Sequence, residues 1–164
     1  MNNIVRKAFL LASEHHKYQK YGEDLYLVHL YDVVSVLIEY GYTDPKYLAT
    51  AWLHDTLEDT TLGYHKIKTE VGKEVAEMVF IVTDEMGRNR KERKAKTLPK
   101  LDGQIDAQIV KLADWIANVR NAHDERPDLI QMYQKDFRDF EKAVRHQADQ
   151  HMETMWVEIE NLLK

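Results

Sequence analysis

The stretch Ala51–Thr60, AWLHDTLEDT, places four ionisable side chains in an otherwise apolar context. These side chains are His54, Asp55, Glu58 and Asp59. On a helix turning about 100° per residue, the four fall within an arc of roughly 140°. An adjacent His-Asp pair is common on helix surfaces, but burying four ionisable side chains on one face requires a counter-charge. A divalent cation held by His54 and Asp55 would supply it, leaving Glu58 and Asp59 for catalysis or support.

A second polar cluster lies in Lys111–Asn118, KLADWIAN. Lys111, Asp114 and Asn118 have helical spacing and share one face, and apolar residues flank them. An aspartate in that setting needs a partner, which is either a metal ion or simply Lys111. His29 follows Tyr26 in another apolar segment and is either a core histidine or a metal ligand.

The composition predicts an all-helical protein. Apolar residues make up 44% of the 164 residues, and six Gly and three Pro are too few for the turns of an all-β chain. We expect one domain over residues 1–164, because no repeat or linker interrupts the sequence. Helices are predicted to begin near Asn2 and at Pro45, and the expected helix from Pro45 includes the residues up to Asp59. Others are predicted for residues 29–40, 73–82 and 106–121.

Several functional classes are excluded by composition. Without cysteine there is no disulfide framework or thiolate site. The apolar runs are far shorter than the ~20 residues that cross a bilayer, and no signal peptide is recognised, so a cytoplasmic protein is expected. A net charge of −5 disfavours general nucleic-acid binding.

The basic residues gather between Arg88 and Lys100, where Glu92 is the one acidic residue. This segment is either a solvated helix or a positive wall over an anionic ligand. In the second interpretation Arg90, Lys91 and Lys94 are candidate phosphate contacts. The Met and aromatic residues from Met132 to the C-terminus have amphipathic spacing and are predicted to be core. His65 and His123 are expected in loops, outside any metal site.

The order His29, His54-Asp55, Asp114 resembles the H…HD…D pattern of HD-domain phosphohydrolases. More narrowly, the chain is similar to the hydrolase domain of RelA/SpoT-type proteins and to the small alarmone hydrolases. Four blocks carry the resemblance, between residues 8 and 121. They are His16-x-x-Gln19 with Tyr26-x-x-His29, the stretch from Ala51 to Thr60, the segment from Val71 to Asp84, and Lys111-Leu-Ala-Asp114-x-x-x-Asn118-x-Arg120.

The resemblance implies a compact helical HD-domain bundle that removes the 3′-pyrophosphate of guanosine 5′-di- or triphosphate 3′-diphosphate. It implies that His29, His54, Asp55 and Asp114 bind one divalent ion, usually Mn²⁺. Glu58 and Asp59 would order and deprotonate the attacking water. Asn118 would contact the nucleotide, and Lys111 would offset its charge.

The chain departs from the family near Gln19. The usual Gln-x-Arg is Gln19-Lys20-Tyr21, with a loop one residue shorter. Lys20 or Tyr21 is therefore a candidate substitute for the base-holding arginine, and adenosine as well as guanosine alarmones are candidate substrates. Trp115 and Ala117 stand where the family commonly has Arg and His.

The ligand set and the acidic pair define the chemistry that we expect. Two imidazoles and two carboxylates suit Mn²⁺, Fe²⁺, Co²⁺ or Zn²⁺ better than Ca²⁺. Two alternatives stay open: another HD phosphohydrolase, such as a nucleoside monophosphatase, and a non-catalytic nucleotide-binding protein. The expected partner is a small nucleotide, with no nucleic acid and no membrane, and the sequence leaves the oligomeric state unknown.

Overall fold

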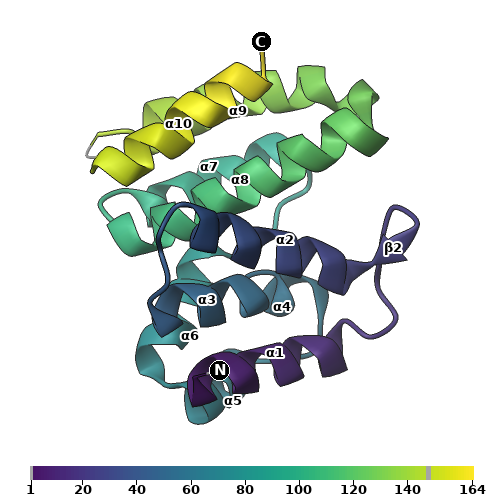
Figure 1. Ribbon diagram of the computed structural model, residues 1–164, viewed down its shortest axis with the longest axis vertical. Coiled ribbons are helices and arrows are strands. Elements are labelled where there is room, and N and C mark those ends of the chain that lie inside the picture. The colour runs from purple at the N-terminus through teal and green to yellow at the C-terminus, as the bar shows by residue number, and fades with distance from the viewer. Residues whose placement is uncertain (1, 147–148) are drawn as a thin grey trace.

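The computed structural model describes residues 2–146 and 149–164, which form a stack of helices (Figure 1). Helices α1 and α5 lie at one end, α2, α3, α6 and α8 in the middle, and α9 and α10 at the other end. The α-helices are α1 Asn3–His15, α2 Tyr26–Glu39, α3 Pro45–Leu53, α4 Thr56–Asp59, α5 Tyr64–Val71, α6 Lys73–Val82, α7 Arg90–Leu101, α8 Ile105–Glu125, α9 Ile130–Val144 and α10 Gln150–Leu162. The short elements are the strands β1 Lys20–Tyr21 and β2 Asp24–Leu25 and the 3₁₀ helix Pro127–Leu129. The all-helical prediction is confirmed.

Side-chain caps set the beginnings of these helices. Asn2 Oδ1 accepts a hydrogen bond from the Ile4 N–H at 2.9 Å, and Asp44 Oδ1 accepts one from the Lys46 N–H at 2.9 Å. Pro45 occupies the first turn of α3, where its missing N–H costs nothing. Both predicted helix starts are therefore confirmed.

One hydrophobic core runs through the stack. Leu30, Leu53 and Leu112, from α2, α3 and α8, are each fully buried. At the C-terminal end, Phe137, Met155 and Trp156 are buried between α8, α9 and α10. The predicted C-terminal core is thus largely confirmed, although Tyr133 and Phe140 also line a cavity.

The expected continuous helix from Pro45 to Asp59 is wrong. Helix α3 ends at Leu53, and α4 begins at Thr56. The His54 ring hydrogen-bonds the Ala51 carbonyl through Nδ1 at 2.7 Å, and the Thr56 hydroxyl donates to the Leu53 carbonyl at 2.6 Å. These side chains satisfy the carbonyls at the end of α3, as C-terminal capping requires. His54 and Asp55 consequently sit in a helix break, outside the helical arc assumed from the sequence.

Three smaller predictions also differ from the structure. The expected loop after Gln19 contains a β-hairpin whose two strands are two residues long, and Gly22 in its turn has φ = 61°. The basic segment, which the sequence predicts to stop near Pro99, forms α7, and this helix passes through Pro99 and ends at Leu101. His65 and His123 lie in α5 and α8, not in loops.

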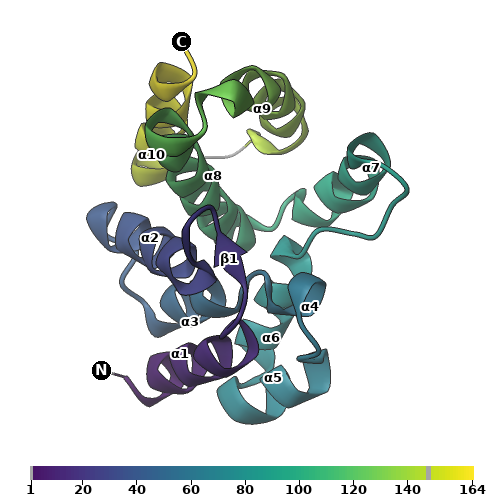
Figure 2. The same cartoon turned by 90° about the vertical axis from the view of Figure 1, so that its right-hand side faces the viewer.

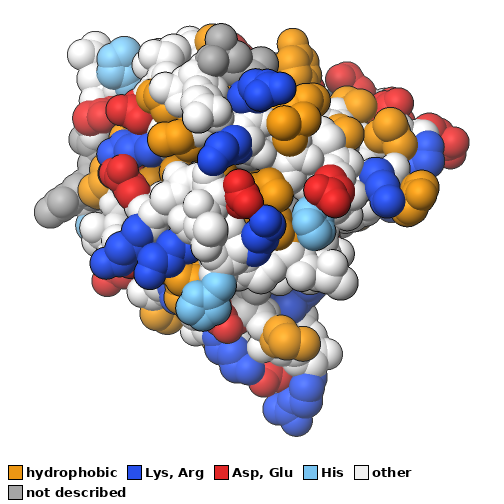
Figure 3. All heavy atoms as spheres, turned by 90° about the horizontal axis from the view of Figure 1, so that it is seen from below, with side chains coloured by type: hydrophobic (Ala, Val, Ile, Leu, Met, Phe, Trp, Pro, Cys, Tyr) orange, Lys and Arg blue, Asp and Glu red, His pale blue; other side chains and the backbone are white. Residues whose placement is uncertain are grey.

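None of the helices in residues 2–146 and 149–164 combines the length and apolarity that a membrane crossing needs. On the face presented by the α1 and α5 end, acidic, basic and apolar side chains are interspersed (Figure 3). Helix α7 instead lies at the side of the molecule, between two loops (Figure 2), and it carries most of the basic segment.

Candidate metal centre and its cavity

The structure brings together His29, His54, Asp55 and Asp114, which come from α2, the α3–α4 break and α8. Ligand atoms of His29, His54 and Asp55 lie within 4.8 Å of one another. Asp114 Oδ1 is 3.3 Å from His29 Nε2 and 3.7 Å from His54 Nε2. His54 Nε2 is 3.0 Å from Asp55 Oδ2. The two imidazoles and the two carboxylates thus point toward one common position.

His54 shows that this position favours a cation. Its side chain is 1% exposed, and its Nδ1 is held by the Ala51 carbonyl. Its buried Nε2 faces Asp55 Oδ2 at 3.0 Å and Asp114 Oδ1 at 3.7 Å without forming a hydrogen bond to either. Burial lowers the pKa of His54, but Asp55 and Asp114 outweigh this effect and raise it to about 10. An imidazole oriented through one nitrogen, with the other directed at carboxylates, is the usual arrangement of a metal-binding histidine. The donor set therefore fits a divalent ion.

Neighbouring side chains hold the two carboxylates. The Tyr26 hydroxyl donates to Asp55 Oδ2. Asn118 Nδ2 donates to Asp114 Oδ1 at 2.5 Å, and Lys111 Nζ lies 3.0 Å from Asp114 Oδ2. Burial lowers the pKa of Lys111, but Asp114 and Asp84 outweigh it and raise the pKa above its usual range, so the ammonium stays charged.

The two residues of the predicted acidic pair, Glu58 and Asp59, lie in different surroundings. Glu58 lines the cavity next to Asp55 and lies 3.4 Å from the Arg93 guanidinium. Burial, followed by the charges of Asp84 and Asp55, raises the pKa of Glu58 to about 7. Asp59 accepts a hydrogen bond from Gln19 Nε2 at 2.8 Å and borders an adjoining hollow, not the cavity itself.

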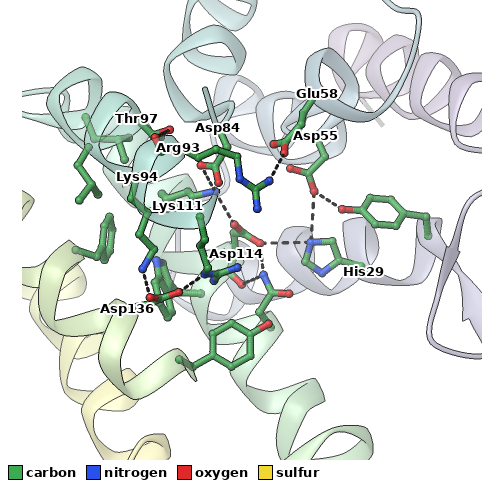
Figure 4. Close-up of a pocket in the computed structure, with 18 residues that line it drawn as sticks. His29, Asp55, Glu58, Asp84, Arg93, Lys94, Thr97, Lys111, Asp114 and Asp136 are labelled. Atoms are coloured by element: carbon green, nitrogen blue, oxygen red, sulfur yellow. Dashed lines mark hydrogen bonds and ion pairs between the residues drawn. The ribbon is translucent and has the colours of Figure 1, made fainter. Parts of the chain in front are cut away.

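The cavity next to the four candidate ligands has a volume of about 240 Å³ (Figure 4). Its wall includes Lys111 and Asn118 from α8, and Arg90, Arg93 and Lys94 from α7. The aromatic side chains of Trp115, Tyr133 and Phe140 complete the side toward α9. The cavity therefore joins a cation-attracting end to a basic and aromatic wall.

Three candidate substrate contacts lie outside this wall. Lys91 is exposed on α7 and is absent from the cavity lining. Lys20 donates to the Glu23 carbonyl at 3.2 Å across the hairpin. Tyr21 donates to Asn118 Oδ1 at 2.8 Å, and its ring stacks on His29 with centroids 4.9 Å apart. Tyr21 thus contacts Asn118 and His29 and does not line the cavity.

Other site residues were not assigned from the sequence. Tyr26 contacts Asp55, but in the sequence it is only one position of a motif. Arg93 was one of several basic residues, and no sequence signal set it apart. Asp136 of α9 is 7% exposed and pairs with both Arg90 and Lys94. A buried aspartate far along the chain could have been found only from the tertiary fold.

Known proteins resemble this chain in sequence and in fold. The HD domain family model matches residues 8–140. The guanosine-3′,5′-bis(diphosphate) 3′-pyrophosphohydrolase MESH1 of Xenopus tropicalis is 33% identical over 123 residues, which are 72% of this chain and 69% of that protein. MESH1 of Danio rerio is 32% identical, over 76% of this chain and 72% of that protein. The bifunctional (p)ppGpp synthase/hydrolase SpoT of Escherichia coli K12 is 33% identical over 132 residues, which are 19% of its length.

A solved structure shares the fold across nearly the whole chain. It belongs to a metazoan SpoT orthologue that hydrolyses ppGpp, and it matches with a TM-score of 0.81 at 23% identity. The match covers 98% of this chain and 96% of that one.

Proposed function

Because this chain belongs to the HD domain family, we propose that it is a metal-dependent hydrolase of 3′-pyrophosphorylated nucleotides. The substrates are guanosine or adenosine 5′-di- or triphosphate 3′-diphosphate, and the products are pyrophosphate and the nucleotide with a free 3′-hydroxyl. The observation that carries the proposal is the convergence of two imidazoles and two carboxylates. Ligand atoms of His29, His54 and Asp55 lie within 4.8 Å of one another, and Asp114 Oδ1 lies 3.3 Å and 3.7 Å from the two imidazole Nε2 atoms. The similarity to MESH1 proteins names the substrate class.

His29, His54, Asp55 and Asp114 would hold the divalent ion, which we propose is Mn²⁺. When bound, such an ion lowers the pKa of its water and polarises a phosphoryl oxygen. Ala51, Tyr26 and Asn118 fix the orientation of the ligand side chains through hydrogen bonds. The ligand atoms need little rearrangement to bind the ion.

Glu58 is the proposed general base. In the hydrolysis, water attacks the phosphorus attached to the 3′-oxygen, the P–O3′ bond breaks, and the 3′-oxygen takes a proton as pyrophosphate leaves. Glu58 accepts the proton of the attacking water, and a pKa near neutrality suits this task. Asp59, which Gln19 holds at the adjoining hollow, is the proposed second acid of the pair and would assist Glu58.

Cations of the cavity wall offset the substrate's charge. Lys111 remains charged beside Asp114, and Arg90, Arg93 and Lys94 reach the cavity from α7. Positioning and charge stabilisation are the main contributions of a protein to phosphoryl transfer. Asn118 is the proposed nucleotide contact on α8. Lys20, Tyr21 and Lys91 would contact the nucleotide outside the cavity lining.

The proposal is tested by identifying the products from a panel of nucleotides. The Mn²⁺-loaded protein is incubated with guanosine and adenosine 5′-diphosphate 3′-diphosphate and with nucleoside monophosphates. We expect pyrophosphate from the first two. Orthophosphate from the monophosphates alone would indicate a nucleoside monophosphatase, and no turnover would indicate a non-catalytic binding protein.

A further inference from the structure

Asp136 is a buried carboxylate on the side of the cavity away from the candidate metal ligands. Figure 4 shows Asp136 with Lys94 across the cavity from His29. Asp136 is 7% exposed and lines the same cavity as His29. Its Oδ2 accepts a hydrogen bond from Arg90 Nε, and its Oδ1 pairs with Lys94 Nζ. The proposed hydrolysis does not use this carboxylate.

The proposed substrate carries anionic groups at both ends. If its 3′-pyrophosphate lies at the metal ligands, its 5′-phosphates must extend along the cavity. Arg90 and Lys94 stand one turn apart on α7 and reach into the cavity on the far side. Together with Asp136 they carry two positive charges and one negative charge, a net positive charge of one. This end can therefore receive the second anionic group.

A carboxylate within an anion site needs a physical reason, because its charge alone repels phosphate. Arg and Lys side chains each carry about 2 kcal/mol of rotamer entropy, part of which is lost when they are ordered by a ligand. Arg90 and Lys94 also repel each other as like charges. A buried carboxylate that contacts both offsets the repulsion and orders them before the ligand arrives, which reduces the cost of binding.

We propose that Asp136 is a positioning residue that holds Arg90 and Lys94 as a receptor for the substrate's 5′-phosphates. This inference rests on the proposed function and names the part of the substrate that the α7–α9 end recognises. It predicts the direction in which Asp136→Asn changes the affinity for the 5′-phosphates. By charge alone, the variant should bind the 5′-phosphates more tightly. If Asp136 positions the two cations, the variant binds them more weakly.

The experiment compares guanosine 5′-diphosphate 3′-diphosphate with guanosine 3′-diphosphate, which lacks the 5′-phosphates. For Asp136→Asn we expect KM for the first substrate to rise about tenfold, with kcat within about twofold of wild type. KM for the second substrate should stay within about twofold of wild type. An unchanged or lowered KM for the first substrate would overturn the inference, as would an equal rise for both substrates.

Two further variants separate positioning from a structural role. Asp139→Asn removes an exposed carboxylate from the same helix and should leave both KM values unchanged. In the Arg90→Gln, Lys94→Gln background, Asp136→Asn should have no further effect on KM, because its effect passes through those side chains. An undiminished effect there contradicts the inference. If Asp136→Asn does not fold, Arg90→Gln still tests the receptor, since it should raise KM for the 5′-phosphorylated substrate alone, and equal KM changes would overturn it.

Failure of the proposed function gives a different result. If wild-type protein hydrolyses neither substrate, the hydrolase proposal is contradicted. The positioning role is then tested by equilibrium binding of guanosine 5′-diphosphate, which needs no turnover. Weaker binding by Asp136→Asn than by Asp139→Asn supports the inference, and equal or tighter binding overturns it.

Discussion

Neighbouring residues of the metal centre are oriented by different partners. His54 is held by the carbonyl of Ala51, three residues earlier, whereas Asp55 is held by the hydroxyl of Tyr26 from α2. The first contact is local and helps to end α3. The second exists only because α2 packs against α3. Sequence motifs can therefore indicate candidate ligands, but not the contacts that orient them.

Glu58 offers the sharpest test of the division between metal ligands and proton acceptor. Glu58→Gln keeps the size of the side chain and leaves the four ligand residues in place. We expect kcat to fall by ~10² or more, because the amide cannot accept the water's proton. Metal content, measured on the purified variant, should match wild type. Loss of the ion would show that Glu58 is a ligand, and full activity would show that it is not the base.

The same carboxylate should set the acidic limb of the pH–rate profile. Burial and the charges of Asp84 and Asp55 raise the pKa of Glu58 to about 7. A bound cation beside Asp55 lowers it again, since it favours the ionised carboxylate. As pH falls, Glu58 becomes protonated and can no longer act as a base. Therefore kcat/KM of the Mn²⁺-saturated enzyme should decrease below an apparent pKa at or under about 7. The residual activity of Glu58→Gln should lack this limb, and an identical limb would assign it to another group.

At the scale of elements, the helix boundaries that depend on local side-chain caps can be predicted from the sequence. Asn2 and the Asp44-Pro45 pair identify helix starts because a cap needs only a side chain and the next few N–H groups. The break after Leu53 cannot be predicted in this way, because helical periodicity does not reveal that the His54 and Thr56 side chains hydrogen-bond the carbonyls of α3. The role of α7 was only partly predictable. Its charge is plain in the sequence, but the cations that face the cavity are selected by packing against α9 and by the acids they meet.

The β1–β2 hairpin should make base recognition weak. Lys20 contacts the hairpin's own Glu23 carbonyl, and Tyr21 is engaged with Asn118 and His29, so neither side chain lines the cavity. A site without dedicated hydrogen bonds to the base discriminates poorly. We expect adenosine and guanosine 5′-diphosphate 3′-diphosphates to be hydrolysed with kcat/KM values within about tenfold, or ~1.4 kcal/mol.

Variants of the hairpin test the same expectation. Lys20→Ala should leave the ratio of the two kcat/KM values unchanged. Tyr21→Phe removes the hydrogen bond to Asn118 and should lower both values alike. A guanosine preference of a hundredfold or more, or a selective loss of the guanosine reaction in either variant, contradicts this prediction.

The position of α7 depends on a close approach at Gly87. A Cβ added at Gly87 would lie 2.8 Å from the Arg93 backbone nitrogen and 2.9 Å from its Cγ. Gly87→Ala should therefore displace the start of α7, at a cost of about 1–3 kcal/mol. We expect a lower midpoint of thermal unfolding and a raised KM, since Arg90, Arg93 and Lys94 move with the helix. Gly63→Ala is the matched control, because that position has space for a Cβ at negative φ. Equal effects of the two substitutions would contradict this role of Gly87.

At the scale of the whole molecule, the candidate metal centre joins segments far apart in the chain. His29 lies in α2, His54 and Asp55 lie in the α3–α4 break, and Asp114 lies in α8. The sequence predicts all four as ligands because their residue types and order match a known pattern, and the structure brings them together; their separations could not be predicted. Asp136 has no such pattern. Its role depends on α9 closing over the cavity, which the amphipathic spacing of the C-terminal segment predicts only as burial.

A ligand set that links three parts of the chain should couple metal binding to global stability. The separate carboxylates repel one another, and an ion bound only by the folded state stabilises it by about 2.7 kcal/mol at 100 times Kd. For a domain of this size that corresponds to a rise of roughly 5–10 °C in the unfolding midpoint. Calorimetry of the Mn²⁺-loaded and chelator-treated protein should show this difference, with close to one ion per chain by metal analysis. His54→Ala and Asp114→Ala should lose most of both signals. His65→Ala, an exposed histidine of α5, should keep them. Retention of the stabilisation by His54→Ala, or its loss in His65→Ala, would place the ion elsewhere.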